Sequence, residues 1–224
     1  MKIALIGDSL TEGRPGVPFI RKLKERYPGL TLVNLGKPGE SVKSLHTRLN
    51  KTKLDTDYDL SFLWIGVNDV YTKLLKVQAQ PIAADQEEFR ELYTKVLESV
   101  IASSKHVVAV SPGLVGEDMQ NAPNQELKEL AAIILSITRS YPNVDFLDIR
   151  SAFKNKLDES DSSGYISTGV LTVMKEALFY KDPKRIDKLS EKRGLHLTLD
   201  GIHLNSRGAE VVAEEFAAVI DRYL

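Results

Sequence analysis

The sequence KIALIGDSLT, residues 2–11, opens the chain with an apolar run that stops at Gly7 and passes into a polar turn carrying Ser9. Short runs of this kind, apolar at nearly every position, are typical of parallel strands that helices cover on both faces. The glycine and the polar residues after it indicate that the strand ends there. The stretch therefore predicts a buried parallel strand with a serine at its carboxyl end.

Four more runs rich in Val, Ile and Leu follow, and segments with apolar residues at three- and four-residue intervals lie between them. These intervals are typical of helices that bury one face. The alternation predicts an α/β fold, a doubly wound sandwich around a five-stranded parallel sheet. A last helix is expected over Ser206–Leu224, after a polar start that suits a helix N-terminus. The predicted strands are Lys2–Gly7, Leu30–Gly36, Tyr58–Gly66, His106–Pro112 and Val144–Arg150.

No linker rich in Pro, Gly and Ser divides the chain, so we expect one domain over residues 1–224. Within it, the segment 151–198 breaks the alternation and forms either a peripheral helical layer or a cap over the candidate site. Its turn Ser160–Gly164 is expected to be mobile. The apolar stretch Ile166–Tyr180 has helical spacing, and two interpretations of it stay open: it lines an acyl pocket, or it packs on the sheet as core.

Composition excludes several classes of protein. The 224 residues are 42% hydrophobic and 27% charged, which is typical of a soluble globular chain. A net charge of -1 provides no large basic field for nucleic acid or for an anionic membrane. The sequence has no cysteine, which excludes disulfides, thiolate zinc sites and cysteine nucleophiles. The first apolar run is too short for a signal peptide and no stretch is long enough to cross a bilayer, so a cytoplasmic protein is expected.

Three residues carry groups that can act together. Ser9 follows the first strand, while Asp200 and His203 precede the last predicted helix. A serine hydroxyl is a weak nucleophile until a neighbouring imidazole takes its proton, and a carboxylate can orient that imidazole. Ligands of open α/β sheets bind beyond the carboxyl ends of the strands, so these groups are expected to meet there, with the Ser9 hydroxyl exposed. The alternatives are an ordinary loop or N-cap serine, a surface or hydrogen-bonded structural histidine, and an aspartate in an Asp-Gly turn.

Two further positions at strand ends offer hydrogen-bond donors. Gly39 lies in the turn after the second predicted strand, and Asn68 follows the third. The Gly39 N–H allows close approach because the residue has no Cβ, and the Asn68 amide supplies a side-chain donor; both suit a developing oxyanion. A plain strand-to-helix turn and an Asx-turn or helix cap are the alternatives.

Asp8 and Asp69 stand beside these positions. With Asp200 and His203 they suggest a divalent metal ion, but a local role is preferred. We expect Asp8 to tie the loop around Ser9 through backbone N–H groups, and Asp69 to cap the helix after the third strand. The other three histidines have no carboxylate or histidine at ligand spacing, and neither a metal nor a cofactor is expected.

Taken in chain order, these motifs resemble those of the SGNH, or GDSL, hydrolase superfamily; they are Gly7-Asp8-Ser9, Gly39, Gly66-x-Asn68-Asp69 and Asp200-x-x-His203. The resemblance implies a flavodoxin-like three-layer α/β/α sandwich with strand order 2-1-3-4-5. It also implies a catalytic triad and an oxyanion hole, with two acids in support. The triad is Ser9, Asp200 and His203, the oxyanion hole is Ser9, Gly39 and Asn68, and the supporting acids are Asp8 and Asp69.

The resemblance implies hydrolysis of small-molecule carboxylic esters by an acylhydrolase, an esterase or a lipase-like enzyme. Three alternatives stay open: an O-acyltransferase, a carbohydrate acetylesterase, and a non-catalytic ligand-binding module. A binding module need not keep every catalytic group, whereas a hydrolase and a transferase differ only in the acceptor. The Gly-x-Ser-x-Gly and Gly-x-x-x-x-Gly-Lys-Ser/Thr sequences are absent, which argues against an α/β-hydrolase elbow and an NTPase. The sequence leaves the oligomeric state open.

Overall fold

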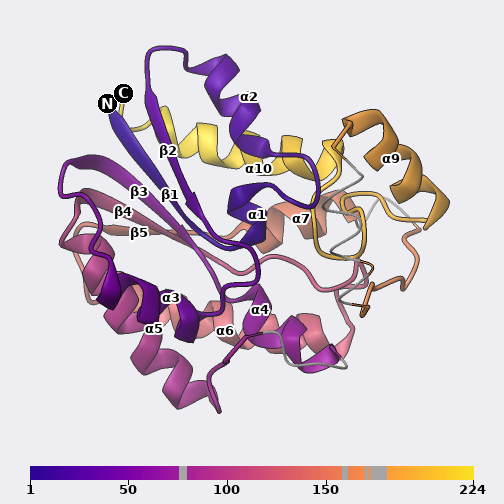
Figure 1. Ribbon diagram of the computed structural model, residues 1–224, viewed down its shortest axis with the longest axis horizontal. Helices are drawn as coiled ribbons and strands as arrows, with labels where there is room; N and C mark the ends of the chain where they lie inside the picture. The colour runs from indigo at the N-terminus through magenta and orange to yellow at the C-terminus, as the bar shows by residue number, and fades with distance from the viewer. Residues whose placement is uncertain (76–79, 158–160, 170–171, 173–180) are drawn as a thin grey trace.

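The computed structural model describes residues 1–75, 80–157, 161–169, 172 and 181–224. Within these residues, five parallel strands form one sheet in the order β2-β1-β3-β4-β5 (Figure 1). The predicted α/β class and the expected strand order are confirmed. The strands are β1 (Lys2–Gly7), β2 (Thr31–Gly36), β3 (Tyr58–Trp64), β4 (Ser104–Val110) and β5 (Val144–Leu147).

Helices cover both faces of the sheet, which gives three layers (Figure 1). One face carries α2 (Phe19–Arg26), α7 (Ile149–Leu157) and α10 (Ser206–Ile220), and the other carries α3 (Val42–Lys51), α5 (Gln86–Ile101) and α6 (Ala122–Thr138). The short elements α1 (Ser9–Glu12), α4 (Val67–Tyr71) and η1 (Thr72–Leu74) follow strand ends, and α9 (Pro183–Lys192) lies at the edge of the molecule.

The hydrophobic core joins the sheet to both helical layers. In β1, which pairs with β2 on one side and β3 on the other, Ile3, Ala4, Leu5 and Ile6 are all fully buried. Successive side chains of a strand point to opposite faces, so a strand that helices cover on both sides is apolar at every position. This is why the opening run of the sequence predicts the centre of the sheet.

The strand order reverses between β1 and β3. The chain passes from β1 to β2, then returns to the other side of β1 to form β3. Where the order reverses in this way, the loops after the two neighbouring strands diverge and leave a crevice beyond their carboxyl ends. The loop after β1 carries Ser9, and α4, after β3, carries Asn68.

Several element ends differ from the predicted ones. β4 lies two residues earlier in the chain than the predicted strand His106–Pro112, and α10 ends at Ile220. The predicted strand Val144–Arg150 stops at Leu147, and α7 begins at Ile149. The side chain of Asp148 accounts for this break, because it accepts hydrogen bonds from the Ser151 N–H (3.3 Å) and hydroxyl (2.6 Å) in the first turn of α7.

The segment 151–198 is described only in part. The Ser163 N–H donates to the Gly194 carbonyl at 2.8 Å, which ties residues 161–164 to the chain just after α9. The Ser167 N–H donates to the Asp200 carbonyl at 2.8 Å, so residues 161–169 lie against the loop that carries Asp200. Residues 170–171 and 173–180 lie outside the described residues, and both interpretations of the apolar stretch Ile166–Tyr180 stay open.

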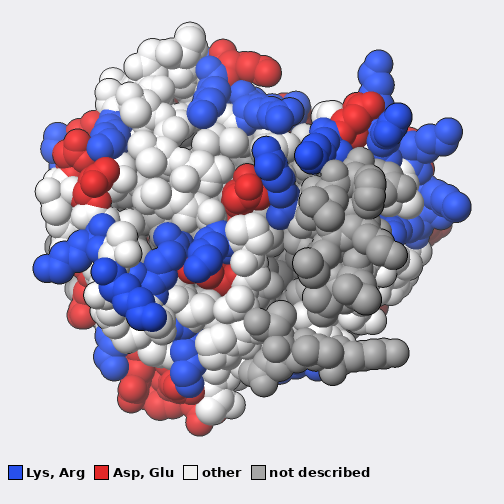
Figure 2. Space-filling view, viewed as in Figure 1, with Lys and Arg blue, Asp and Glu red and all other residues white. Residues whose placement is uncertain are grey.

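Helix α9 has one buried side and one basic side. Ile186 and Ser190 are buried, whereas the exposed cations include Lys184, Arg185 and Lys188. These belong to the cluster of Lys and Arg side chains at the α9 end of the molecule in Figure 2. In the part of the chain that the structure describes, no helix has both the length and the apolar character that a membrane span requires.

Candidate active site

Ser9 lies where β1 gives way to α1. Asp8 is the N-cap of α1, and its Oδ1 accepts a hydrogen bond from the Leu10 N–H at 2.9 Å. The carboxylate therefore fixes the turn around the serine, as expected for Asp8. The expectation that the Ser9 hydroxyl is exposed is wrong, since Ser9 is only 4% exposed. A buried hydroxyl requires a hydrogen-bond partner, and His203 provides it.

A continuous chain of hydrogen bonds joins Ser9, His203 and Asp200. The Ser9 Oγ lies 3.0 Å from His203 Nε2, and His203 Nδ1 lies 2.7 Å from Asp200 Oδ2. When Nδ1 carries the proton and donates it to the carboxylate, Nε2 is left to accept from the serine hydroxyl. This arrangement can take a proton from Ser9 as the oxygen attacks an electrophile.

Asp200 is held rigidly and is fully buried. Its Oδ1 accepts from the backbone N–H groups of Ile202 at 3.0 Å and His203 at 2.8 Å. Burial on its own raises the pKa of the Asp200 carboxyl, but the positive charge of His203 and the hydrogen bonds from His203 and Ile202 outweigh it, and the pKa is lowered overall. A carboxylate that stays ionised in this position stabilises an imidazolium on His203.

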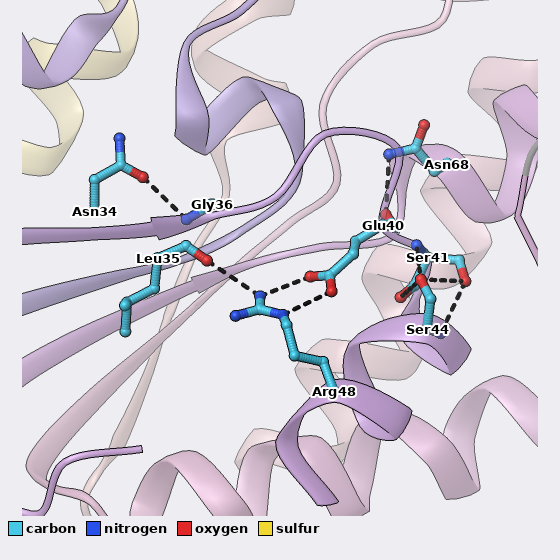
Figure 3. A network of polar contacts seen from close by, with 8 residues as sticks. All are labelled: Asn34, Leu35, Gly36, Glu40, Ser41, Ser44, Arg48 and Asn68. Carbon is cyan, nitrogen blue, oxygen red and sulfur yellow. Dashed lines mark hydrogen bonds and ion pairs between the residues drawn. The ribbon is translucent and has the colours of Figure 1, made fainter. Parts of the chain in front are cut away.

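Asn68 contacts the loop between β2 and α3 that carries Gly39. Gly39 has a φ of 77°, a left-handed conformation that favours glycine. Asn68 is 7% exposed, and its Nδ2 donates to the Glu40 carbonyl at 2.9 Å, as Figure 3 shows. An amide nitrogen carries two N–H groups, so this bond leaves one of them for another acceptor.

The same loop packs against the loop that carries Ser9. The Lys37 N–H donates to the Gly7 carbonyl at 2.9 Å. At Gly36 a Cβ would lie 2.3 Å from the Glu12 backbone nitrogen, so only a glycine allows the two loops to approach so closely. The backbone after β2 is thereby brought next to the backbone after β1.

Asp69 serves a different helix from the one expected. It lies in the first turn of α4, whose N-cap is Gly66, and its Oδ2 accepts from the Val42 N–H at 2.9 Å. The expectation that Asp69 caps the helix after the third strand is therefore wrong, because Asp69 ties α4 to the start of α3. Burial raises the pKa of Asp69 to about 7, although the hydrogen bond from the Val42 N–H acts to lower it.

The acids near His203 influence one another. Burial raises the pKa of Asp8 to about 7; its bond from Leu10 and the charge of His203 lower it, while Asp69 and Glu40 raise it. Asp8 therefore lies close enough to His203 to interact with its charge.

Sequence reasoning missed Glu117, which is 3% exposed in the loop after β4. Its carboxylate accepts from three successive backbone N–H groups, those of His196, Leu197 and Thr198, at 2.7 to 2.8 Å. This loop leads directly to Asp200. No local pattern marks Glu117 in the sequence, because all of its partners lie about eighty positions further along the chain.

The other three histidines make contacts with residues other than Ser9, Asp200 and His203. His46 Nε2 lies 3.0 Å from Asn50 Nδ2 on α3, and the His106 ring lies 5.0 Å from that of Tyr223. His196 is held by Glu117. Among the residues that the structure describes, no group of three or more His, Cys, Asp or Glu is arranged to hold a metal ion.

Comparisons with known proteins agree with this architecture. The family model described as GDSL-like Lipase/Acylhydrolase matches residues 5–211, which confirms the resemblance drawn from the motifs. No curated protein matches the sequence.

Several solved structures share the fold. A catalytic mutant of an acetylxylan esterase from Geobacillus stearothermophilus is 17% identical, with a TM-score of 0.69 over 97% of this chain and 92% of that chain. The acetyl xylan esterase AlAXEase is 20% identical, with a TM-score of 0.67 over 98% of this chain and 100% of that chain. A member of the lipolytic protein G-D-S-L family from Veillonella parvula DSM 2008 is 16% identical, with a TM-score of 0.68 over 99% of each chain. At these identities the likeness shows a common fold.

Proposed function

Since this chain belongs to the GDSL-like lipase/acylhydrolase family, and is therefore a serine ester hydrolase, we propose that it uses Ser9, His203 and Asp200 as its catalytic triad. The observation that supports this most directly is the pair of contacts at His203, 3.0 Å to the Ser9 hydroxyl and 2.7 Å to the Asp200 carboxylate. These are the distances at which a base receives a proton and an acid orients the base.

The reaction is acyl transfer through a covalent intermediate. His203 takes the Ser9 proton while Ser9 Oγ forms a bond to the ester carbonyl carbon. The tetrahedral intermediate collapses, the bond to the alcohol oxygen breaks, and the imidazolium of His203 gives its proton to the leaving alcohol. Water then attacks the acyl-enzyme with His203 again as the base, which releases the acid and restores Ser9. The buried Asp200 carboxylate stabilises the imidazolium of His203 in both acylation and deacylation.

Three donors are assigned to the oxyanion. They are the N–H groups of Ser9 and Gly39 and the second N–H of the Asn68 amide. The hydrogen bond from Asn68 to the Glu40 carbonyl supports this role, because it joins the amide to the residue that follows Gly39. Losing one such donor lowers kcat by about 10²–10³-fold.

The natural substrate is a small-molecule ester, and two classes of alcohol are proposed for it. One is an acylated lipid or simple alcohol, and the other is an acetylated carbohydrate. Two of the structural neighbours are acetylxylan esterases, so acetylated xylo-oligosaccharides are the first sugar esters to test. Transfer of the acyl group to an alcohol instead of water needs the same groups; product analysis with and without added alcohol separates the two reactions.

Replacing Ser9 tests the assignment. Ser9→Ala is expected to abolish hydrolysis of p-nitrophenyl acetate while the circular dichroism spectrum stays that of the wild type. Ser99→Ala, which removes a hydroxyl of α5 that donates to the Lys95 carbonyl, is the matched control and should keep full activity. Wild-type turnover in Ser9→Ala would exclude Ser9 as the nucleophile.

A further inference from the structure

Glu40 and Arg48 form an ion pair beside the assigned oxyanion donors (Figure 3). Glu40 directly follows Gly39 and is 2% exposed. Arg48, in the last turn of α3, donates from Nε to Oε1 and from Nη2 to Oε2, both at 2.6 Å. Because two bonds join the groups, the guanidinium fixes the direction of the carboxylate as well as its distance.

These two residues hold both ends of the loop between β2 and α3. Arg48 Nη2 also donates to the Leu35 carbonyl in β2 at 3.1 Å. The backbone carbonyl of Glu40 accepts from Asn68 Nδ2 at 2.9 Å. Arg48 thus binds both Leu35 and Glu40, and Gly39 lies between these two residues in the chain. Glu40 also accepts the hydrogen bond that orients the Asn68 amide.

The pair is not needed to cap α3. Ser41 is the N-cap, and its hydroxyl accepts from the Ser44 N–H at 3.2 Å while the Ser44 hydroxyl accepts from the Ser41 N–H at 2.8 Å (Figure 3). This reciprocal pair already satisfies the start of the helix. A buried ion pair is also seldom the most stable choice, since desolvation offsets the attraction of the charges. Capping of α3 therefore does not account for the pair.

We propose that the Arg48–Glu40 ion pair is a positioning device for the oxyanion donors, holding the Gly39–Glu40 peptide and the Asn68 amide in one arrangement. This rests on the proposed function. One N–H of Asn68 is bound to the Glu40 carbonyl, which leaves the other to donate to the substrate oxygen as it becomes negative. When Glu40 shifts, the peptide and the amide shift together. The loss falls on the transition state, in which the charge on that oxygen is developed.

Arg48→Ala tests the proposal, with Arg26→Ala as the matched control. Arg26 forms an exposed ion pair with Asp221 at 2.6 Å, on the opposite face of the sheet. For p-nitrophenyl acetate, Arg48→Ala should lower kcat about 10–100-fold and change KM less than about threefold. The kcat of Arg48→Lys should lie between those of the wild type and Arg48→Ala, because an ammonium cannot bind both carboxylate oxygens in a fixed plane. Arg26→Ala should match the wild type.

Two readouts separate positioning from a structural role. Added guanidinium ion should restore part of the kcat of Arg48→Ala and none of that of Ser9→Ala. The affinity for a boronic acid, which forms a tetrahedral adduct with the serine, should fall in parallel with kcat across the Arg48 variants. Melting temperatures, recorded for every variant, show whether the assay temperature leaves each one folded.

Three outcomes would overturn the proposal. They are an unchanged kcat in Arg48→Ala, a loss that appears in KM alone, and an unchanged affinity for the boronic acid. If Arg48→Ala does not fold, Arg48→Lys decides: wild-type kcat and boronic acid affinity in that variant count against positioning. Activity in Ser9→Ala would instead refute the proposed function, whatever the Arg48 variants do.

Discussion

Oε1 of Glu117 accepts hydrogen bonds from both the backbone N–H and the hydroxyl of Thr198, each at 2.8 Å. The Thr198 hydroxyl in turn accepts from the Gly201 N–H at 3.2 Å. A single buried carboxylate in the loop after β4 thus holds the start of the loop that carries Asp200 and His203, across 81 positions of sequence. The position of the imidazole depends on Glu117 as well as on Asp200.

Glu117→Ala is expected to lower the free energy of unfolding by about 3–5 kcal/mol, because several buried donors lose their acceptor at once. It should also lower kcat, since the loop that orients His203 is released. Urea unfolding measures the first effect and ester hydrolysis the second. Glu126→Ala removes a partly exposed ion pair with Lys73 and should cost no more than about 1 kcal/mol. Equal stability losses in the two variants would contradict the role given to Glu117.

Asp200→Asn is expected to lower kcat by about 10³–10⁴-fold with little change in fold. The asparagine carbonyl can still accept from the Ile202 and His203 N–H groups, but its NH₂ group can donate to Nδ1. The ring proton then moves to Nε2, which can no longer accept from the Ser9 hydroxyl. Because the pKa of Asp200 is lowered in the folded protein, the fall of kcat/KM towards acid pH in the wild type should follow protonation of the imidazole.

His203→Ala is the companion variant and should lose more activity than Asp200→Asn, because it removes the base itself. Asp161→Asn makes the same chemical change as Asp200→Asn at an exposed position, so it is the control and should keep the wild-type rate. A fully active Asp200→Asn variant would count against the triad.

The sheet could be predicted because parallel strands covered on both faces are apolar runs, as in β1 and β3. The ends of elements were harder to predict, since they depend on single side chains. The strand over residues 144–147 ends where the Asp148 carboxylate captures the Ser151 N–H, and no hydrophobic pattern reports such a bond. The contact between Ser9 and His203 could be predicted from topology, because loops beyond the carboxyl ends of parallel strands lie at the same edge of the sheet. The two side chains are indeed 3.0 Å apart.

What could not be predicted depends on contacts between distant segments. The burial of Ser9 requires a residue 194 positions away to cover it. Asp69 follows β3 and invites the interpretation of a local cap, yet its acceptor oxygen faces the start of α3, 27 positions earlier. The roles of Glu117 and Arg48 are likewise set by tertiary contacts, since neither stands in a recognisable motif.

Asp69→Asn should change how stability depends on pH. The pKa of Asp69 rises from 3.8 to about 7 on folding, so between these values the folded protein holds a proton that the unfolded chain has lost. The free energy of unfolding therefore falls as pH rises from about 4 to about 7, by at most about 1.4 kcal/mol per pH unit for one such group, and levels off above pH 7. Asparagine cannot ionise, so the variant should lose the part of the slope that Asp69 contributes, while Asp8, whose pKa is also raised to about 7, keeps its own part. The asparagine carbonyl can still accept from Val42.

Asp59→Asn should change the pH dependence of stability in the opposite direction. The pKa of Asp59 is lowered in the folded protein by its hydrogen bonds from Lys105 and the Lys2 N–H, so its contribution is present above the unfolded pKa and lost as pH falls. Urea unfolding at pH values from 4 to 8 compares both variants with the wild type. The Asp69 assignment fails if Asp69→Asn keeps the wild-type slope between pH 5 and 7.

Asn68→Ala tests the proposed role of Asn68 as the side-chain donor of an oxyanion hole. Its kcat should fall by about 10²–10³-fold with KM nearly unchanged, because the amide acts on charge that develops only in the transition state. Asn50→Ala, an exposed change on α3 that removes a contact with His46, is the control and should keep the wild-type kcat.

Asn68→Asp separates the donor from the shape of the side chain. The carboxylate has nearly the same size but no N–H to donate, and it would face both the Glu40 carbonyl and the substrate oxyanion with negative charge. We therefore expect Asn68→Asp to be slower than Asn68→Ala at neutral pH, and to recover towards the rate of Asn68→Ala when the new carboxyl is protonated at lower pH. Activities are compared as kcat relative to wild type at each pH, which removes the titration of His203 from the comparison. If Asn68→Asp equals the wild type, Asn68 only shapes the loop, and the oxyanion is left to the backbone N–H groups of Ser9 and Gly39.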